Sequence, residues 1–286
     1  MAVTDTQIEY LEDMATHIRQ DVIIMLEEAG SGHSAGSLGT ADIFSTLYFH
    51  IMKHDPKNPD WEDRDKFVLS NGHICPVLYA TLAEAGYYPK KEIHTLRKLG
   101  SRLQGHPHRG SLPGLEASGG PLAQGISIAV GMAMSAKIDD KRNKIYSMVG
   151  DGEMNEGQVW EALMFTGKNR LHNFTLIIDR NNIQIDGFTE NVMPLEPLKD
   201  KLSSFGFHVI EVDGHNIRRL IEAFEETIFE KPKALLAHTI PGKGVDFMEF
   251  KPEWHGKPPN KEEAGKALQE LEELRSLGGK ITCEHE

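Results

Sequence analysis

From residue 144 onward, short apolar runs alternate with helical patterns, and this alternation constrains the fold more than any other feature of the chain. Apolar runs bounded by turn residues are typical of buried strands, whereas apolar residues spaced three and four apart indicate helices. Strands separated by single helices predict an α/β fold with a doubly wound parallel sheet flanked by helices, whose ligands bind beyond the carboxyl ends of the strands. The expected strands here are Ile145 to Val149, Phe174 to Ile178, Phe207 to Val212 and Ala234 to Thr239.

The first half of the chain adds one strand and several helices. Apolar residues from Ile8 to Met25 recur at helical spacing, which predicts a helix ending near Gly30. Residues 101–120 are rich in glycine without an apolar period, so we predict a long ordered loop, a feature that is usually functional. The last expected helix, Lys261 to Leu277, is charged and shows no obvious core beneath it. The other expected elements are a strand from Lys66 to Ser70 and helices at Ala41 to Ile51, Pro76 to Glu84, Lys90 to Lys98, Ala123 to Ala136, Val159 to Lys168 and Ile217 to Phe229.

Composition excludes several classes of protein. With 43 acidic and 31 basic side chains the formal net charge is -12, which argues against a nucleic-acid-binding surface. No apolar run approaches the roughly 20 residues that span a bilayer. The first residues lack the basic start and apolar block of a secretory signal, so we expect a cytoplasmic protein. Cys75 and Cys283 are too few for a disulfide framework or a thiolate metal site.

The turn Gly150-Asp151-Gly152 follows the strand that begins at Ile145, and Glu153 and Glu156 lie at the start of the next helix. The glycines let the backbone approach a phosphate closely, and the helix N-terminus favours an anion. Asp151 between them can hold a divalent cation. An isolated turn of this kind is better explained as a strand-to-helix connection with the aspartate as a cap.

A second polar turn changes that balance. Asp179-Arg180-Asn181-Asn182 ends the next strand, and 28 residues separate Gly152 from Asn181, enough for one helix and one strand. Parallel strands joined by one helix end at the same edge of a sheet, so Asp151 and Asn181 can reach one metal ion. Mg²⁺ prefers about six oxygen ligands and often shares them with phosphate. A magnesium ion bridging a diphosphate is the natural occupant.

These two turns resemble the thiamine diphosphate motif, and the text GDGEMNEGQVWEALMFTGKNRLHNFTLIIDRNNIQIDG is similar to transketolases. Further matching pieces are GSGHSAGSLG, LSNGH, GHP, GGPLAQG and WHG, and the resemblance extends from about residue 8 to about residue 260. It implies a transferase of aldehyde or ketone groups that uses thiamine diphosphate with Mg²⁺, or Ca²⁺ or Mn²⁺. Such an enzyme moves a two-carbon ketol unit from a ketose or its phosphate to an aldose or its phosphate.

The resemblance also implies roles for individual residues. The metal ligands would be Asp151, Asn181 and the backbone carbonyl of Ile183. The aminopyrimidine end of the cofactor would be lined by Gly120, Pro121 and Leu122. The remaining cofactor contacts would come from His73, Gly150, Gly152, Glu153, Asn181 and His255.

Four of the 14 histidines sit beside glycine in expected loops: His33, His73, His106 and His255. A lone histidine is more often a cap or a core hydrogen-bonding residue, the role we expect for His215. By the resemblance, His33, His106 and His255 bind the substrate and assist proton movement, while His73 serves the cofactor.

Two other residues, Glu156 and Lys243, have competing interpretations. Glu156 either stabilises the first helical turn or is the carboxylate that transketolases bury between subunits. Its position five residues after Asp151 matches the family and favours the interface. Lys243 either approaches a phosphate or is a solvated loop residue, and Cys75 is expected to serve packing alone.

Transketolases need a second, pyrimidine-binding domain, whose glutamate tunes the cofactor ring. This sequence stops before such a domain, so residues 1–286 read as the diphosphate-binding domain with 261–286 as a helical tail. The chain thus resembles the N-terminal half of a split transketolase. We expect it to be inactive alone and to work with a C-terminal subunit, two copies of each forming a heterotetramer. The tail helix and the glycine-rich packing of 119–136 are consistent with a large interface.

Two alternatives stay open. The chain could belong to an enzyme of the deoxyxylulose-phosphate synthase type, which shares both turns, or be a non-catalytic thiamine diphosphate-binding homologue. The first would consume pyruvate, and the second would show no turnover with any partner. The sequence does not identify the ketose donor or the aldose acceptor, and sugar phosphates are the default expectation.

Overall fold

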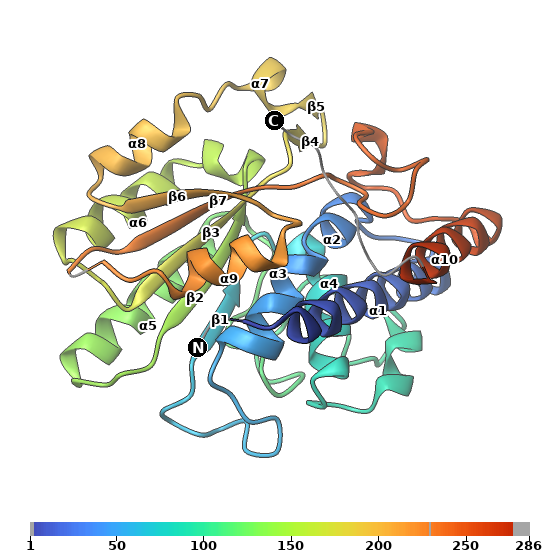
Figure 1. Ribbon diagram of the computed structural model, residues 1–286, viewed down its shortest axis with the longest axis horizontal. Coiled ribbons are helices and arrows are strands. Elements are labelled where there is room, and N and C mark those ends of the chain that lie inside the picture. The colour runs from blue at the N-terminus through green and yellow to red at the C-terminus, as the bar shows by residue number, and fades with distance from the viewer. Residues whose placement is uncertain (1–2, 229, 277–286) are drawn as a thin grey trace.

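A computed structural model of the chain describes residues 3–228 and 230–276, and its centre is a parallel sheet (Figure 1). The sheet has five strands in the order β1-β2-β3-β7-β6, and every neighbouring pair is parallel. The predicted α/β architecture is therefore confirmed. The strands are β1 (Lys66–Leu69), β2 (Ile145–Gly150), β3 (Phe174–Arg180), β6 (His208–Asp213) and β7 (Lys233–His238).

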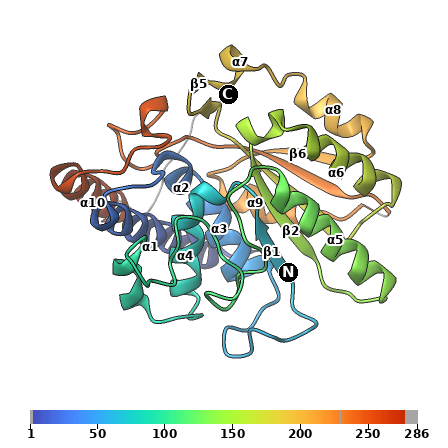
Figure 2. The same cartoon turned by 180° about the vertical axis from the view of Figure 1, so that it is seen from behind.

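Helices cover both faces of the sheet, as the two opposite views show (Figures 1 and 2). Met148 and Ile177 pack into one core, whereas their neighbours Val149 and Ile178 pack into the other, because side chains alternate along a strand. One face carries α5 (Gln124–Ile138), α6 (Gly157–Lys168) and α8 (Leu198–Ser204). The other carries α1 (Asp5–Ala29), α3 (Ala41–Thr46), α4 (Cys75–Glu84) and α9 (Ile217–Glu225).

The predicted helix boundaries hold where capping residues are present. Thr4 and Gln7 form a capping box at the start of α1, and Gly30 ends it with a φ of 61°. Three predicted helices are wrong in extent. The one expected from Ile217 to Phe229 already ends at Glu225. The helix expected from Ala41 to Ile51 changes to a π-helical turn, η1 (Leu47–Ile51), and the one expected from Lys90 to Lys98 is only a 3₁₀ turn, η3 (Lys90–Thr95).

The expectation that the last helix lacks a core is also wrong. Helix α10 (Lys261–Ser276) lies against α1, and Ala264, Ala267 and Leu271 are buried there (Figure 1). Gln20 of α1 donates a hydrogen bond to Glu272 of α10 over 3.1 Å. The helix therefore belongs to the core of this chain. The rest of the predicted tail, 277–286, lies outside the described residues together with Cys283.

Short elements follow the carboxyl ends of the strands and build the edge where we predict ligand binding. Within the described residues, 101–120 contain neither helix nor strand, as predicted. No helix in the described ranges combines the length and apolar character needed to cross a bilayer. The short elements are α2 (Ala35–Gly39), η2 (Gly72–Ile74), η4 (Gly152–Asn155), β4 (Ile183–Gln184), β5 (Gly187–Phe188), α7 (Thr189–Val192) and η5 (Pro252–Trp254).

Candidate functional site

The two polar turns lie side by side at the carboxyl edge of the sheet. Gly150 of β2 is in register with Asp179 of β3, and the backbone N–H of Asp151 donates to the Asp179 carbonyl over 3.2 Å. Asp151 and Asn181 therefore follow the ends of adjacent strands, as expected for parallel strands joined by one helix.

Asp151 is buried, with 1% of its surface exposed, and three donors surround its carboxylate. Oδ1 accepts from the N–H of Gly152 over 2.7 Å. Oδ2 accepts from Arg180 Nη1 over 3.0 Å and from the N–H of Asn182 over 2.7 Å. Burial raises the pKa of Asp151, and the Arg180 guanidinium opposes that rise.

Arg180 is a central residue of this edge that sequence reasoning missed. Its side chain is 3% exposed, and Nη2 donates to Glu190 over 2.6 Å and to Glu196 over 3.0 Å. It therefore joins the end of β3 to the segment around α7 while holding Asp151. The only signal in the sequence is its place in the polar run at the end of β3.

Asn181 is held at both ends of its amide. Nδ2 donates to Asp179 Oδ2 over 2.6 Å, and Oδ1 accepts from the N–H of Ile183 over 3.0 Å. Asp179 in turn accepts a hydrogen bond from Thr239 Oγ1 over 2.5 Å. Burial raises the pKa of Asp179 to about 7.

The donor set at this edge fits a small divalent cation. Asp151 offers a carboxylate, Asn181 an amide oxygen and Ile183 a backbone carbonyl, which are oxygen ligands of the kind that Mg²⁺ prefers. A carboxylate has about four lone-pair positions, and three of those of Asp151 already accept hydrogen bonds. Across 3–228 and 230–276, no three His, Cys, Asp or Glu side chains cluster as a metal site. A cation here would therefore need other oxygens, such as those of a phosphate.

Three of the four predicted histidines form one cluster. His33 precedes α2, His73 lies in η2 after β1, and His255 follows η5. Their ring centroids are 4.9 Å apart for His33 and His73, 5.3 Å for His73 and His255, and 5.9 Å for His33 and His255. His33 Nδ1 is buried and has no hydrogen-bond partner among the described residues. Such an atom is suited to a ligand group.

The histidine cluster is neutral near pH 7. Burial, reinforced by the neighbouring imidazoles, lowers the pKa of His33 to about 4 and that of His73 to about 3. Burial also lowers the pKa of His255, and burial together with Arg97 lowers that of His106. A neutral imidazole has one donor and one acceptor nitrogen, so each ring can relay a proton or orient a hydroxyl.

Backbone segments approach each other closely beside this cluster. A Cβ at Gly72 would lie 3.2 Å from the nitrogen of Gly120, and one at Gly120 would lie 3.9 Å from Cγ of His106. Gly120 also has a φ of +132°, which side chains rarely adopt. Pro121 and Leu122 follow at the surface, Leu122 being 37% exposed. Two of the three residues assigned to the aminopyrimidine end are thus open to solvent in this chain.

Glu153 connects three segments through one buried carboxylate. Oε1 accepts from Ser70 Oγ and from the N–H of Ala123, each over 2.6 Å, and Oε2 accepts from the N–H of Gly150 over 3.2 Å. The side chain therefore ties the end of β1 and the start of α5 to the turn after β2. Glu156, by contrast, is exposed and makes no side-chain capping bond to α6.

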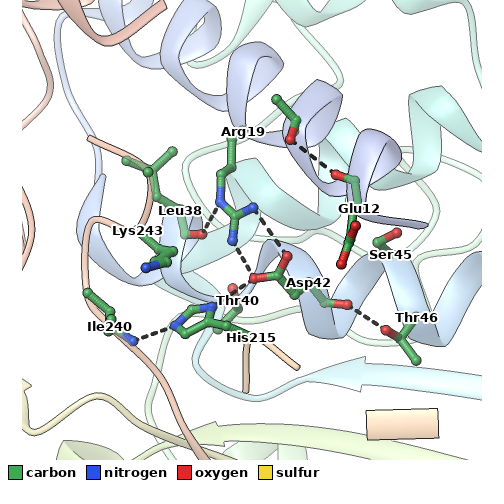
Figure 3. Close-up of polar contacts among 12 residues, drawn as sticks. Glu12, Arg19, Leu38, Thr40, Asp42, Ser45, Thr46, His215, Ile240 and Lys243 are labelled. Atoms are coloured by element: carbon green, nitrogen blue, oxygen red, sulfur yellow. Dashed lines mark hydrogen bonds and ion pairs between the residues drawn. The ribbon is translucent and has the colours of Figure 1, made fainter. Parts of the chain in front are cut away.

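A buried polar network anchors the segment that leads to His255 (Figure 3). His215 Nδ1 lies 2.7 Å from Asp42 Oδ2, and His215 Nε2 accepts from the N–H of Ile240 over 2.7 Å. Since Nε2 accepts, Nδ1 carries the proton. Arg19 pairs with the same Asp42 oxygen at 2.5 Å. The structural role predicted for His215 is confirmed.

The burial of Lys243 and Cys75 tests the roles predicted for these two residues. Lys243 is 4% exposed and its Nζ lies 3.6 Å from Glu249 Oε1, so the interpretation as a solvated loop lysine is wrong. Cys75 is 1% exposed and forms no disulfide within the described part of the chain, and burial raises its pKa to about 12. The packing role predicted for Cys75 agrees with this placement.

Comparison with known proteins gives a consistent result. The family described as "Transketolase, thiamine diphosphate binding domain" matches residues 11–272. The chain is 42% identical over 272 residues to the 6-deoxy-6-sulfo-D-fructose transketolase subunit SqwG of a Clostridium species, covering 94% of this chain and 98% of that relative. It is 39% identical over 269 residues to an apulose-4-phosphate transketolase subunit from Phocaeicola vulgatus, covering 93% and 95%.

Longer transketolases match over part of their length. Rat transketolase is 38% identical over 272 residues, which cover 93% of this chain and 42% of that protein. Among solved structures, transketolase from Campylobacter jejuni superposes with a TM-score of 0.87 at 34% identity, covering 95% of this chain and 43% of that one.

Proposed function

The chain belongs to the transketolase thiamine diphosphate-binding domain family, and we propose that it is one subunit of an enzyme that transfers two-carbon ketol units. The observation that supports this most directly is the position of the neutral histidine cluster beside the oxygen-lined edge of the sheet. Asp151, Asn181 and the carbonyl of Ile183 would hold Mg²⁺, or Ca²⁺ or Mn²⁺. The backbone of Gly150 and Gly152 would approach the diphosphate.

When bound, thiamine diphosphate supplies the electron sink for breaking a carbon–carbon bond of the ketose. The chain's own residues would then orient the substrate and move its protons. His33 and His255, as neutral rings 5.9 Å apart, can contact hydroxyls on the first carbons of a ketose, with His106 nearby. His73, whose pKa burial lowers to about 3, would contact the cofactor together with Glu153 and Gly120.

A second subunit would complete the site. Pro121, Leu122 and Glu156 are exposed, and α6 also carries exposed apolar side chains, with Met164 60% and Phe165 44% exposed. Exposed apolar surface of this kind marks an interaction site. Two relatives that match over nearly their whole length are named subunits. We infer a C-terminal transketolase subunit with a pyrimidine-binding domain as partner, two copies of each chain, and a cytoplasmic location.

The relatives also indicate a substrate class. The names of two of them specify a sulfonated fructose and a phosphorylated apulose, both sugars with an anionic group. We therefore expect the donor to be a ketose with a terminal anionic group and the acceptor to be an aldose phosphate.

The decisive experiment is to recover this chain with its bound partner and to assay the complex for ketol transfer with thiamine diphosphate and Mg²⁺. The complex should transfer ketol units, while the isolated chain should not. Full activity of the chain alone would contradict the two-subunit proposal. Consumption of pyruvate would indicate the deoxyxylulose-phosphate synthase type, and no turnover with any partner would indicate a non-catalytic homologue.

The metal assignment has its own test. Asp151→Ala should abolish binding of Mg²⁺ and cofactor while the fold persists, because Arg180 keeps Glu190 and Glu196 as partners. Asp60→Ala, at an exposed carboxylate, is the matched control and should bind as the wild type does. Cofactor affinity retained by Asp151→Ala would refute the assignment.

A further inference from the structure

A cavity lies at the edge of the sheet opposite the candidate site, where the strands begin. It has a volume of about 750 Å³, within the range of small-molecule sites. Its floor is a row of side chains in register on four neighbouring strands: Tyr146, Thr175, Lys233 and His208. Register partners project to the same face of a sheet, so the four side chains stand next to one another. Phe224, at the end of α9, forms part of the wall.

The cavity is basic although the protein is acidic. Seven Lys or Arg residues line it against three Asp or Glu residues, in a chain of formal net charge -12. Three of these cations, Arg142, Lys144 and Lys231, are exposed and have no side-chain hydrogen bond or ion pair within the described ranges. Charges concentrated in a concave site attract small ions of opposite sign more strongly than the same charges on an open surface.

One buried donor at the cavity has no partner in the part of the chain that the structure describes. Tyr146 is 1% exposed, lines the cavity, and its hydroxyl makes no hydrogen bond among the described residues. A buried polar group without a partner is destabilising unless a ligand or water satisfies it. Tyr146 therefore brings an unsatisfied hydroxyl donor to the lining of the cavity.

Lys233 contributes charge rather than hydrogen bonds. Its Nζ donates to the carbonyls of Ala223, Phe224 and Glu226, which cap the end of α9. Burial, with the charge of Lys144 adding to it, lowers the pKa of Lys233 to about 8. An anion between Lys144 and Lys233 would relieve their mutual repulsion.

We propose that this cavity is a second ligand site that binds a phosphorylated small molecule, remote from the catalytic edge. The free cations on the rim and the unpartnered hydroxyl on the floor are all donors, which suits the oxygens of phosphate groups. The volume suits a small organic phosphate. This inference is independent of the proposed ketol transfer, because none of the residues involved belongs to the catalytic edge.

The test is calorimetric titration of the whole chain with inorganic tripolyphosphate at low ionic strength. Lys144→Gln/Lys231→Gln should bind at least tenfold more weakly than the wild type. Lys57→Gln/Lys91→Gln, which removes the same charge at exposed lysines outside the cavity, should bind as the wild type does. Tyr146→Phe should bind more weakly without a lower Tm, since its hydroxyl has no partner to lose.

A further variant separates this site from the predicted diphosphate site. His73→Ala alters the opposite edge and should leave tripolyphosphate binding unchanged. Absence of binding by the wild type would overturn the proposal. The proposal would also be overturned if Lys144→Gln/Lys231→Gln bound tripolyphosphate as tightly as the wild type, or if His73→Ala lost tripolyphosphate binding.

Discussion

The side-chain amide of Asn181 is fixed in orientation by Asp179, whose Oδ2 accepts a hydrogen bond from Nδ2 over 2.6 Å. The N–H of Ile183 donates to the other end of the amide, Oδ1, over 3.0 Å, so two independent contacts assign its nitrogen and oxygen. Asp179 is itself anchored to Thr239, which follows β7. The orientation of a proposed metal ligand therefore depends on a residue buried behind it.

Asp179→Ala should lower Mg²⁺-dependent affinity for thiamine diphosphate by about 10- to 100-fold, as is typical when the residue that orients a ligand is removed. Asp179→Asn keeps a carbonyl oxygen that Asn181 can donate to, and it should retain most of the affinity. Calorimetric titration of the complex measures both, and each variant's Tm reports whether the fold is intact. Equal affinity of Asp179→Ala and wild type would show that Asn181 is oriented without Asp179.

Glu153→Ala should destabilise the chain by about 3 kcal/mol or more, because it leaves three donors without their charged acceptor in a buried place. Glu161→Ala, at an exposed position of the following helix, should change stability by less than about 0.5 kcal/mol. Urea unfolding of the two variants gives the comparison. A similar small effect for both would mean that the carboxylate does not hold these segments together.

The sheet could be predicted from the sequence because its strands have simple signals. The apolar runs of β2 and β3 are buried along their length, and the observed strands, Ile145–Gly150 and Phe174–Arg180, start where predicted. The short helices were harder. The segments Leu47–Ile51 and Lys90–Thr95 form a π-helical turn and a 3₁₀ turn, which the spacing of apolar residues does not distinguish from an α-helix.

The site was predictable only in part. That Asp151 and Asn181 lie on adjacent strand ends follows from topology. Topology does not predict which side chains hold Asp151 and Asn181. The contacts of Arg180 and Asp179 depend on side-chain direction and burial. Lys243 illustrates the same limit, because a lysine between glycines reads as a solvated loop residue, yet the fold buries it beside Glu249.

Asp42→Asn should destabilise the chain by about 3–5 kcal/mol, because it leaves Arg19, 1% exposed, without its carboxylate partner. Asp5→Asn breaks a pair between the same residue types, Asp5 with Arg218, but Asp5 is 90% exposed, so the expected cost is about 0–1 kcal/mol. Denaturant unfolding of both variants distinguishes the buried pair from the surface pair. Equal costs would show that the buried network does not depend on the charge of Asp42.

Acidification should destabilise the isolated chain through the histidine cluster. An unfolded histidine has a pKa near 6.5, whereas burial lowers the pKa of folded His33 to about 4 and of folded His73 to about 3. Between these values the unfolded chain binds more protons than the folded one, so the free energy of unfolding decreases as the pH falls. The contribution is fully present above about pH 6.5 and is lost progressively toward pH 4.

His33→Gln removes one of these groups, so its Tm should fall less than that of the wild type between pH 6.5 and 4. Carboxylates also titrate toward the acid end of this range and affect both proteins. The quantity to compare is therefore the difference in Tm between the variant and the wild type at each pH. His108→Gln, at an exposed histidine in the 101–120 loop, is the matched control and should follow the wild-type curve. If His33→Gln follows it as well, the cluster does not exclude protons, and the neutral imidazoles on which the proposed proton transfers depend are not present.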